Sequence, residues 1–142
     1  STVPPDAGAA AAPGSTAQTT RTAPMSRDVP ARETLDCMKL CGECGGMCLQ
    51  CSFHCLHMGG QHASPEHQCL MHDCADICNT VACFMARNSQ HAPHLCAECA
   101  EICNQCAAAC DKLANGDPMM KQCADLCRKC AQACEKMAGA PV

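Results

Sequence analysis

Small and apolar residues recur three or four positions apart along most of the chain, with polar residues between them. The segment Cys99 to Cys110, CAEICNQCAAAC, has the most complete form of this pattern, with cysteines separated by four, three and four positions. The segment Cys123 to Cys134, CADLCRKCAQAC, repeats it 24 positions later. Residues at this spacing share one face of an α-helix. The pattern therefore predicts helices whose buried faces are lined by thiols.

Signals for helix ends and starts divide the chain. Gly59-Gly60 and Asn115-Gly116 are expected to end helices, whereas Ser64-Pro65 and Asp117-Pro118 are expected to begin them. We expect helices at about residues 31–58, 65–87, 93–114 and 118–138. Short loops make successive helices antiparallel, so residues 30–142 are predicted to form an all-α, up-down-up-down four-helix bundle with a cysteine-lined core. Residues 1–29, rich in Ala, Pro, Ser and Thr, are predicted to be a disordered tail.

Alignment of the repeats shows which residue types occupy the inward positions. Cysteine is commonest, methionine is next and histidine is occasional, and all three residue types bind metals. Val81 and Met85 stand where the other repeats carry cysteine, and Cys69 and Cys83 fall outside the stripe, so we expect these two thiols at the flank or outside of the bundle. The candidate metal ligands are Cys37, Cys41, Cys44, Cys48, Cys51, Cys55, Cys74, Cys78, Cys96, Cys99, Cys103, Cys106, Cys110, Cys123, Cys127, Cys130, Cys134, Met58, His67, Met71 and Met120.

Composition narrows the class of protein. The chain has 19 cysteines among 142 residues, only two Phe, and no Trp or Tyr, so Cys, Ala, Leu, Ile and Met must fill its core. The net charge of −4, without a run of Lys or Arg, gives no reason to expect a nucleic-acid partner. No apolar run approaches the roughly 18 residues that span a bilayer, so no membrane partner is expected. An odd cysteine count leaves one thiol over in any purely intramolecular disulfide framework.

The CxxxC spacing favours a soft metal. Residues i and i+4 of a helix have Cβ atoms about 5–6 Å apart, whereas a disulfide needs them about 3.5–4.5 Å apart. Such a pair resists oxidation but leaves room for one ion between two sulfurs, and thiolates and thioethers select Cu(I). Eight CxxxC pairs occur on the predicted stripes, and bridging thiolates would raise the load toward one ion per cysteine. We therefore expect a dense line of Cu(I) ions along the bundle axis.

A chain rich in cysteine could also be a zinc protein, an iron–sulfur protein or an enzyme with a catalytic cysteine. Zinc prefers closed tetrahedral sites, usually with CxxC knuckles on loops, although two facing pairs could supply four sulfurs. The ferredoxin run C-x₂-C-x₂-C-x₃-C-P is absent, which disfavours an iron–sulfur protein. A catalytic cysteine needs a distinctive neighbourhood, and these cysteines are repetitive, so no enzyme activity is expected.

The cysteine-lined helices, with CAEICNQCAAAC and CADLCRKCAQAC above all, resemble the bacterial copper storage proteins, and the resemblance covers about residues 35–137. It implies a homotetramer of bundles, each storing many Cu(I) ions largely through CxxxC pairs, with ions entering at one end. Met71 and Met120 depart from the pattern, because other helices carry cysteine in those positions. The alternative function is a metal-delivery chaperone, or a carrier of iron–sulfur clusters or zinc.

Two further expectations concern copper entry and location. In an up-down bundle, the end that holds the first and third loops collects Met58, His67, Met71 and Met120. Histidine and methionine bind copper less tightly than thiolate, so we expect this end to be the entrance. The opposite end, with Met85, Met137, His91 and His94, is the alternative. The tail and the absence of an initial methionine favour a periplasmic, exported protein, with the cytoplasm as the alternative.

Overall fold

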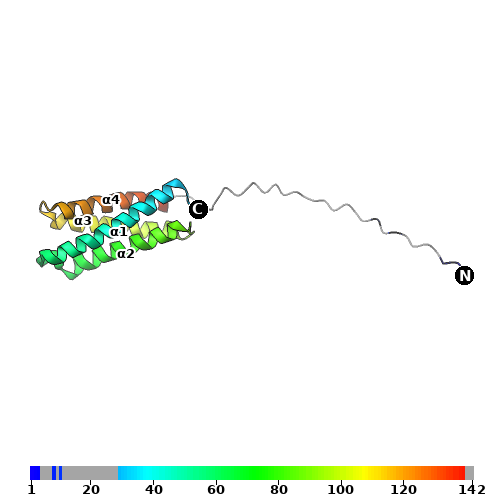
Figure 1. Cartoon of the computed structure of the whole chain (residues 1–142), viewed down its shortest axis with the longest axis horizontal. Helices are drawn as coiled ribbons and strands as arrows, with labels where there is room; N and C mark the ends of the chain where they lie inside the picture. Colours follow the sequence, from blue (N-terminus) through cyan, green and yellow to red (C-terminus); the bar gives the residue numbers. More distant parts are fainter. Residues whose placement is uncertain (4–7, 9, 11–28, 140–142) are drawn as a thin grey trace.

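Four long helices alternate in direction along one axis (Figure 1). They are α1 (Arg32–Met58), α2 (Pro65–Ala86), α3 (Ala92–Ala114) and α4 (Pro118–Ala138), with a short 3₁₀ helix, η1 (Gly60–Ala63), between α1 and α2. The structure is a computed structural model that describes residues 1–3, 8, 10 and 29–139. It confirms the predicted all-α four-helix bundle with a cysteine-lined core. The predicted tail, residues 1–29, falls mostly outside the described residues.

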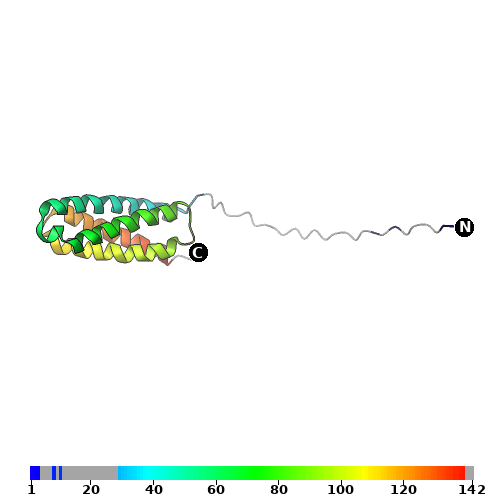
Figure 2. The same ribbon diagram turned by 90° about the horizontal axis from the view of Figure 1, so that it is seen from below.

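Helices that are neighbours in sequence pack side by side, and α1 also packs against α4, which closes the bundle (Figure 2). The closest pairs are α1 with α2 and α3 with α4. We call the end that carries residues 59–64 and 115–117 the loop end. The opposite end carries the start of α1, the turn between α2 and α3, and the end of α4, and we call it the terminal end. In the described part of the chain, no helix is long and apolar enough to cross a membrane.

Local capping chemistry sets the helix ends as predicted. The hydroxyl of Ser64 accepts a hydrogen bond from the backbone N–H of His67 at 3.3 Å, and the carboxylate of Asp117 accepts one from the N–H of Met119 at 2.9 Å. Asn115 adopts the left-handed conformation after α3, with φ 42° and ψ 42°. The 3₁₀ helix was not predicted from sequence; it follows Gly59, whose φ of 71° turns the chain away from α1.

The core contains thiols, alanines and a few larger side chains. Seventeen of the 19 cysteines are buried, together with Val81 and the methionines 71, 85 and 120. Buried alanines lie beside the thiols on α2, α3 and α4, and they allow the helices to approach closely. The bundle therefore has a narrow interior in which sulfur atoms of different helices meet.

Gly45 lies at a close contact between α1 and α2. A Cβ atom at this position would lie 2.7 Å from the side-chain oxygen of Asn79 and 3.3 Å from the backbone oxygen of Ala75, whereas a Cβ at Gly46 would meet nothing within 4 Å. We expect Gly45→Leu to destabilise the copper-free protein by about 1–3 kcal/mol through overpacking. The matched variant Gly46→Leu should be neutral or stabilising, because leucine favours helix over glycine. Urea unfolding of the reduced protein measures both, and equal stabilities of the two variants would contradict the close contact.

Candidate metal centre

The thiols of the core are almost completely shielded from solvent. Sixteen of the 17 buried cysteines have no exposed surface, and Cys37 is 3% exposed. Cys69 and Cys83 lie on the exposed side of α2, as their position outside the stripe predicted. All 19 cysteines are free thiols.

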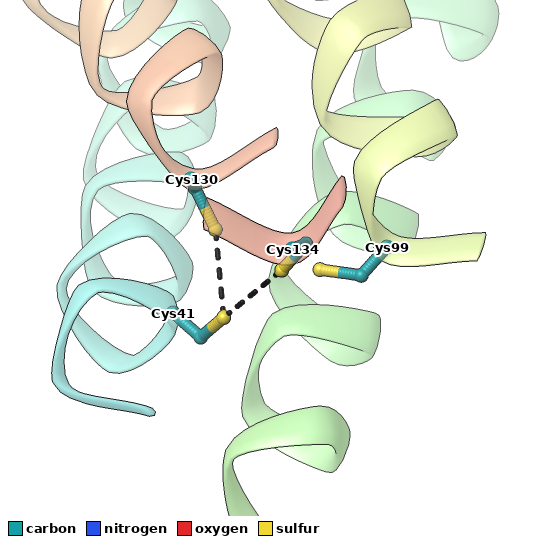
Figure 3. Close-up of side chains that lie close together, drawn as sticks. All are labelled: Cys41, Cys99, Cys130 and Cys134. Carbon is teal, nitrogen blue, oxygen red and sulfur yellow. Dashed lines mark hydrogen bonds between the residues drawn. The ribbon is translucent and has the colours of Figure 1, made fainter. Parts of the chain in front are cut away.

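The shortest contacts between sulfurs join different helices. The Sγ atom of Cys41 on α1 lies 3.5 Å from the Sγ atoms of both Cys130 and Cys134 on α4 (Figure 3). On the other side of the core, the Sγ atoms of Cys78 and Cys103 are also 3.5 Å apart. The expectation from sequence emphasised CxxxC pairs within one helix. Among the described residues, one CxxxC pair has its two sulfurs within hydrogen-bonding distance: the Sγ atoms of Cys99 and Cys103 are 3.9 Å apart.

Thiols also meet in groups of four. In each group the sulfur atoms lie within 4.8 Å of one another, and each group draws its members from three helices. Successive groups share members, so that the groups form a continuous series along the bundle axis. From the terminal end toward the loop end the groups are Cys41, Cys99, Cys130 and Cys134; Cys78, Cys99, Cys103 and Cys130; Cys44, Cys74, Cys78 and Cys103; Cys44, Cys48, Cys74 and Cys127; and Cys48, Cys106, Cys123 and Cys127.

These separations suit a metal ion. With metal–sulfur bonds of about 2.3 Å, as for zinc, two sulfurs on one ion are about 3.8 Å apart at a tetrahedral angle and about 4.6 Å apart when opposite. The contacts described above, 3.5 to 3.9 Å, lie near the lower of these values. An ion could therefore enter a group with small movements of the cysteine side chains. The sulfur-only donor set is the kind that Cu(I) prefers.

Hydrogen bonds between neighbouring thiols lower the pKa of the thiol that accepts and raise the pKa of the thiol that donates. Donation from Cys134 and Cys41 lowers the pKa of Cys37 to about 4. Donation from Cys103 and Cys134 lowers the pKa of Cys130 to about 6. The pKa of Cys134 is raised, chiefly because its S–H group donates to Cys130. Thiolate is the form that binds a metal, and these hydrogen bonds favour it at Cys37 and Cys130.

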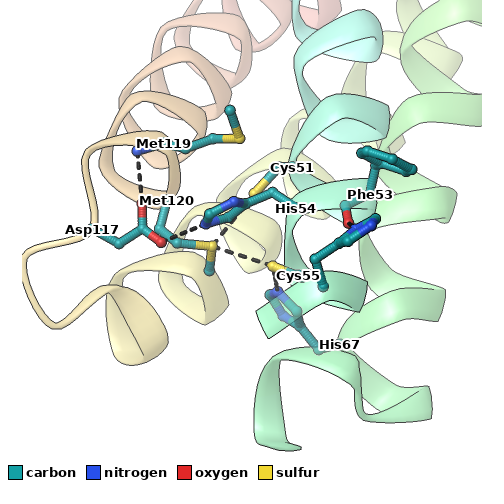
Figure 4. Close-up of polar contacts among 9 residues, drawn as sticks. Cys51, Phe53, His54, Cys55, His67, Asp117, Met119 and Met120 are labelled. Atoms are coloured by element: carbon teal, nitrogen blue, oxygen red, sulfur yellow. Dashed lines mark hydrogen bonds and ion pairs between the residues drawn. The ribbon is translucent and has the colours of Figure 1, made fainter. Parts of the chain in front are cut away.

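Methionine and histidine join the thiols at the loop end (Figure 4). The Sδ atom of Met120 lies 3.3 Å from the Sγ atom of Cys55 and 3.5 Å from that of Cys51. The Nε2 atom of His67 lies 3.5 Å from the same Cys55 sulfur. Burial raises the pKa of Cys55 and lowers the pKa of His67, so this imidazole is neutral near pH 7 and can offer a lone pair. Thioether, imidazole and thiol therefore converge on the last part of the core.

The other candidate ligands divide between core and surface. Met71 is fully buried at the loop end, whereas Met58 is 53% exposed and lies outside the core. At the terminal end, the Sδ atom of Met85 lies 4.0 Å from the Sγ atom of Cys96. Met85 stands where other repeats carry cysteine, and this contact makes it a further thioether donor to the core. Metal binding by Met58 stays a prediction.

Sequence reasoning missed a hydrogen bond between α1 and the start of α4 at the loop end. The Nε2 atom of His54 on α1 lies 2.5 Å from a carboxylate oxygen of Asp117, the residue that caps α4 (Figure 4). The hydrogen bond from His54 lowers the pKa of Asp117, as does the N–H of Met119. Asp117 was interpreted from sequence only as a cap, because nothing in the local pattern indicates a partner 63 positions away.

The bundle matches a known protein family. The model of a family described as copper storage protein matches residues 31–139, which include the whole bundle. The chain belongs to the copper storage protein family. A relative of known sequence, the uncharacterised cysteine-rich protein YhjQ of Bacillus subtilis strain 168, is 33% identical over 76 residues, which make up 54% of this chain and 70% of YhjQ.

Solved structures share both the fold and the sequence. Nmul_A1745 of Nitrosospira multiformis is 40% identical, with a TM-score of 0.70, over 76% of this chain and 97% of that one. A Cu(I)-bound copper storage protein, BsCsp3, is 31% identical, with a TM-score of 0.70, over 76% of this chain and 100% of its own. The copper-free form of copper storage protein 3 from Bacillus subtilis is 33% identical, with a TM-score of 0.65, over 73% and 97% of the two chains.

Proposed function

We propose that this member of the copper storage family holds many Cu(I) ions inside its bundle, bound by cysteine thiolates. The observation that carries the proposal is the continuous series of buried four-thiol groups, each drawn from three helices. Sulfur-only donors select a soft ion, and shared sulfurs allow thiolates to bridge neighbouring ions. Family membership and the Cu(I)-bound relative support the same conclusion.

The geometry favours storage over the alternative functions. A delivery chaperone needs an exposed site that a partner can reach, whereas 16 of the 17 core thiols have no exposed surface. Structural zinc sites are closed units of four ligands, whereas neighbouring groups here share their sulfurs. We propose that the bound copper is cargo and that the protein catalyses no reaction.

Titration of the reduced protein with Cu(I) under anaerobic conditions tests this function. Formation of Cu–thiolate bonds is followed by near-ultraviolet absorption, which the protein barely obscures because it lacks Trp and Tyr. We expect the signal to rise until at least eight ions are bound, one for each CxxxC pair on the stripes. Saturation at one or two ions would reject storage, and a brown, iron-loaded protein would support an iron–sulfur carrier instead.

We also propose that copper enters at the loop end, through the predicted ligands Met58, His67, Met71 and Met120. The contacts of Met120 and His67 with Cys55 support this route, since they would pass an ion from weaker donors to a thiol. The triple variant Met58→Leu, Met71→Leu and Met120→Leu should take up Cu(I) more slowly than the wild type while keeping most of its capacity. Stopped-flow absorption measures the rate. A matched variant at the terminal end, Met85→Leu with Met137→Leu, should leave it unchanged, and equal rates in all three proteins would sink the proposal.

Assembly and location are also proposals. We propose a homotetramer, and the exposed apolar side chains of Leu49, Phe53 and Leu56 on α1 support an interface there, because they are 45%, 67% and 55% exposed in the single chain. Light scattering measures the assembly directly.

The periplasmic location stays a prediction that cell fractionation tests.

A further inference from the structure

One buried cysteine of the core keeps a small exposed surface. Cys37 is the buried cysteine with measurable exposure, and it lines a groove of about 290 Å³ between the first half of α1 and the last half of α4. This volume is at the lower limit for a site that binds a small molecule. A second groove, at the loop end, is lined by Leu49, Phe53 and Met119 among others and contains no thiol.

Cys37 is connected to the rest of the copper core. Its Sγ atom lies 3.9 Å from that of Cys134, which in turn lies 3.5 Å from that of Cys41. Cys41 and Cys134 belong to the four-thiol group nearest the terminal end. An ion bound to Cys134 in that group is therefore one sulfur-to-sulfur contact from Cys37, which lines the groove. At the loop end, by contrast, Cys51, Cys55, Met71 and Met120 all have no exposed surface.

The groove offers charges of both signs. Glu33 and Asp36 line it on the α1 side, and Lys129 and Lys136 line it on the α4 side. Asp36 also pairs with the exposed Arg32 at 3.5 Å. Leu40 and Met137 provide apolar surface between the charged residues. A small molecule with both a carboxylate and an ammonium group would find an opposite charge on each wall.

We propose that this groove is an exit site at which a low-molecular-weight thiol, bearing carboxylate and ammonium groups, withdraws Cu(I) from the core at Cys37. The inference rests on the proposed storage function and adds how copper leaves. The incoming thiol releases its proton to water as its own sulfur binds copper, and Cys37 is left as the thiolate. The bond between copper and Cys37 breaks, copper stays Cu(I), and nothing is oxidised or reduced. Copper bound deeper in the core then moves outward by exchange between neighbouring thiolates.

The first test needs no copper. In the reduced, copper-free variant Cys69→Ser with Cys83→Ser, the two exposed thiols are absent, and brief alkylation with iodoacetamide followed by peptide mass spectrometry identifies the most accessible core thiol. We expect Cys37 to be modified several-fold faster than Cys55 at the loop end. Faster labelling of Cys55, or one common rate for all core thiols, would overturn the inference, since the first shows access at the other end and the second shows exposure by unfolding.

The second test uses the full chain loaded with Cu(I), with glutathione as the thiol and a coloured Cu(I) chelator as the final acceptor. Leu40→Trp should fill the groove and slow glutathione-dependent release several-fold. Its control, Gln105→Trp, places the same side chain at an exposed position on α3 outside the groove and should release copper at the wild-type rate. Unchanged release from Leu40→Trp, or equal slowing in both variants, would overturn the exit site.

A change of charge in the groove gives a third test, which does not depend on the folding of Leu40→Trp. Lys136→Glu should slow release by glutathione several-fold but not release by uncharged mercaptoethanol, and Lys121→Glu on the exposed face of α4 should change neither. Equal effects on the two thiols would contradict recognition of the charged one. Copper capacity is measured first on each sample. Failure of the wild type to load several ions would overturn the storage function itself, whereas normal loading with unselective release would overturn only the exit site.

Discussion

The melting temperature of this protein should rise by tens of degrees when its core is filled with Cu(I). Each four-thiol group draws on three helices, so an ion bound there links helices that the copper-free protein holds together only by packing. A ligand that binds only the folded state at 1,000 times its Kd adds about 4 kcal/mol. In a domain of this size, 1 kcal/mol shifts Tm by about 4 °C. One tightly bound ion therefore adds about 15 °C, and further ions add more.

Circular dichroism of loaded and copper-free samples measures this shift under anaerobic conditions. Partial loading should give intermediate melting temperatures, and removal of copper by excess chelator should restore the lower value. A shift of only a few degrees at full loading would mean that the ions lie on the surface and do not join the helices.

Replacement of two neighbouring core cysteines should lower the copper capacity by more than the single ion that one CxxxC pair would hold. Cys44 and Cys48 together take part in three of the five described four-thiol groups. The variant Cys44→Ala with Cys48→Ala therefore removes a ligand from each of these groups, while it takes away only two sulfur atoms. Anaerobic titration with Cu(I) gives the capacity, and far-ultraviolet circular dichroism checks that the bundle still folds.

The chain provides a matched control with the same number of cysteines removed. Cys69 and Cys83 are exposed on α2 and belong to none of the described groups. Cys69→Ala with Cys83→Ala should therefore keep the wild-type capacity. Equal losses in the two double variants would show that copper is bound without regard to the core, and a loss of one ion in the core variant would favour independent pairs.

The fold could be predicted from sequence because its signals are local. Ser64 and Asp117 cap the helices that follow them, and Asn115 adopts the left-handed conformation at the end of α3. The inward face was equally clear, since helical periodicity alone places Cys69 and Cys83 outside and the other 17 cysteines inside. These features depend on residues within a few positions of one another.

Features that depend on the register between helices could not be predicted. Periodicity tells which face of α1 is buried but not that Cys41 faces Cys130 and Cys134. That register depends on close packing at sites such as Gly45, where the surface of α2 leaves no room for a side chain. The pairing of His54 with Asp117 and the groove beside Cys37 depend on it in the same way. The sequence therefore identifies the type of ligand, whereas the structure shows which helices bring their ligands together.

The sharing of sulfurs between neighbouring groups has a consequence for how the core fills. Cys44, Cys103 and Cys130 each belong to two groups, so an ion in one group reduces the donors left for the next. A partly loaded molecule then has many arrangements of the same number of ions with similar energies. This multiplicity contributes entropy that is greatest near half-filling and disappears when the core is empty or full. Intermediate loads should therefore form broad mixtures, and the last ions should bind more weakly than the first.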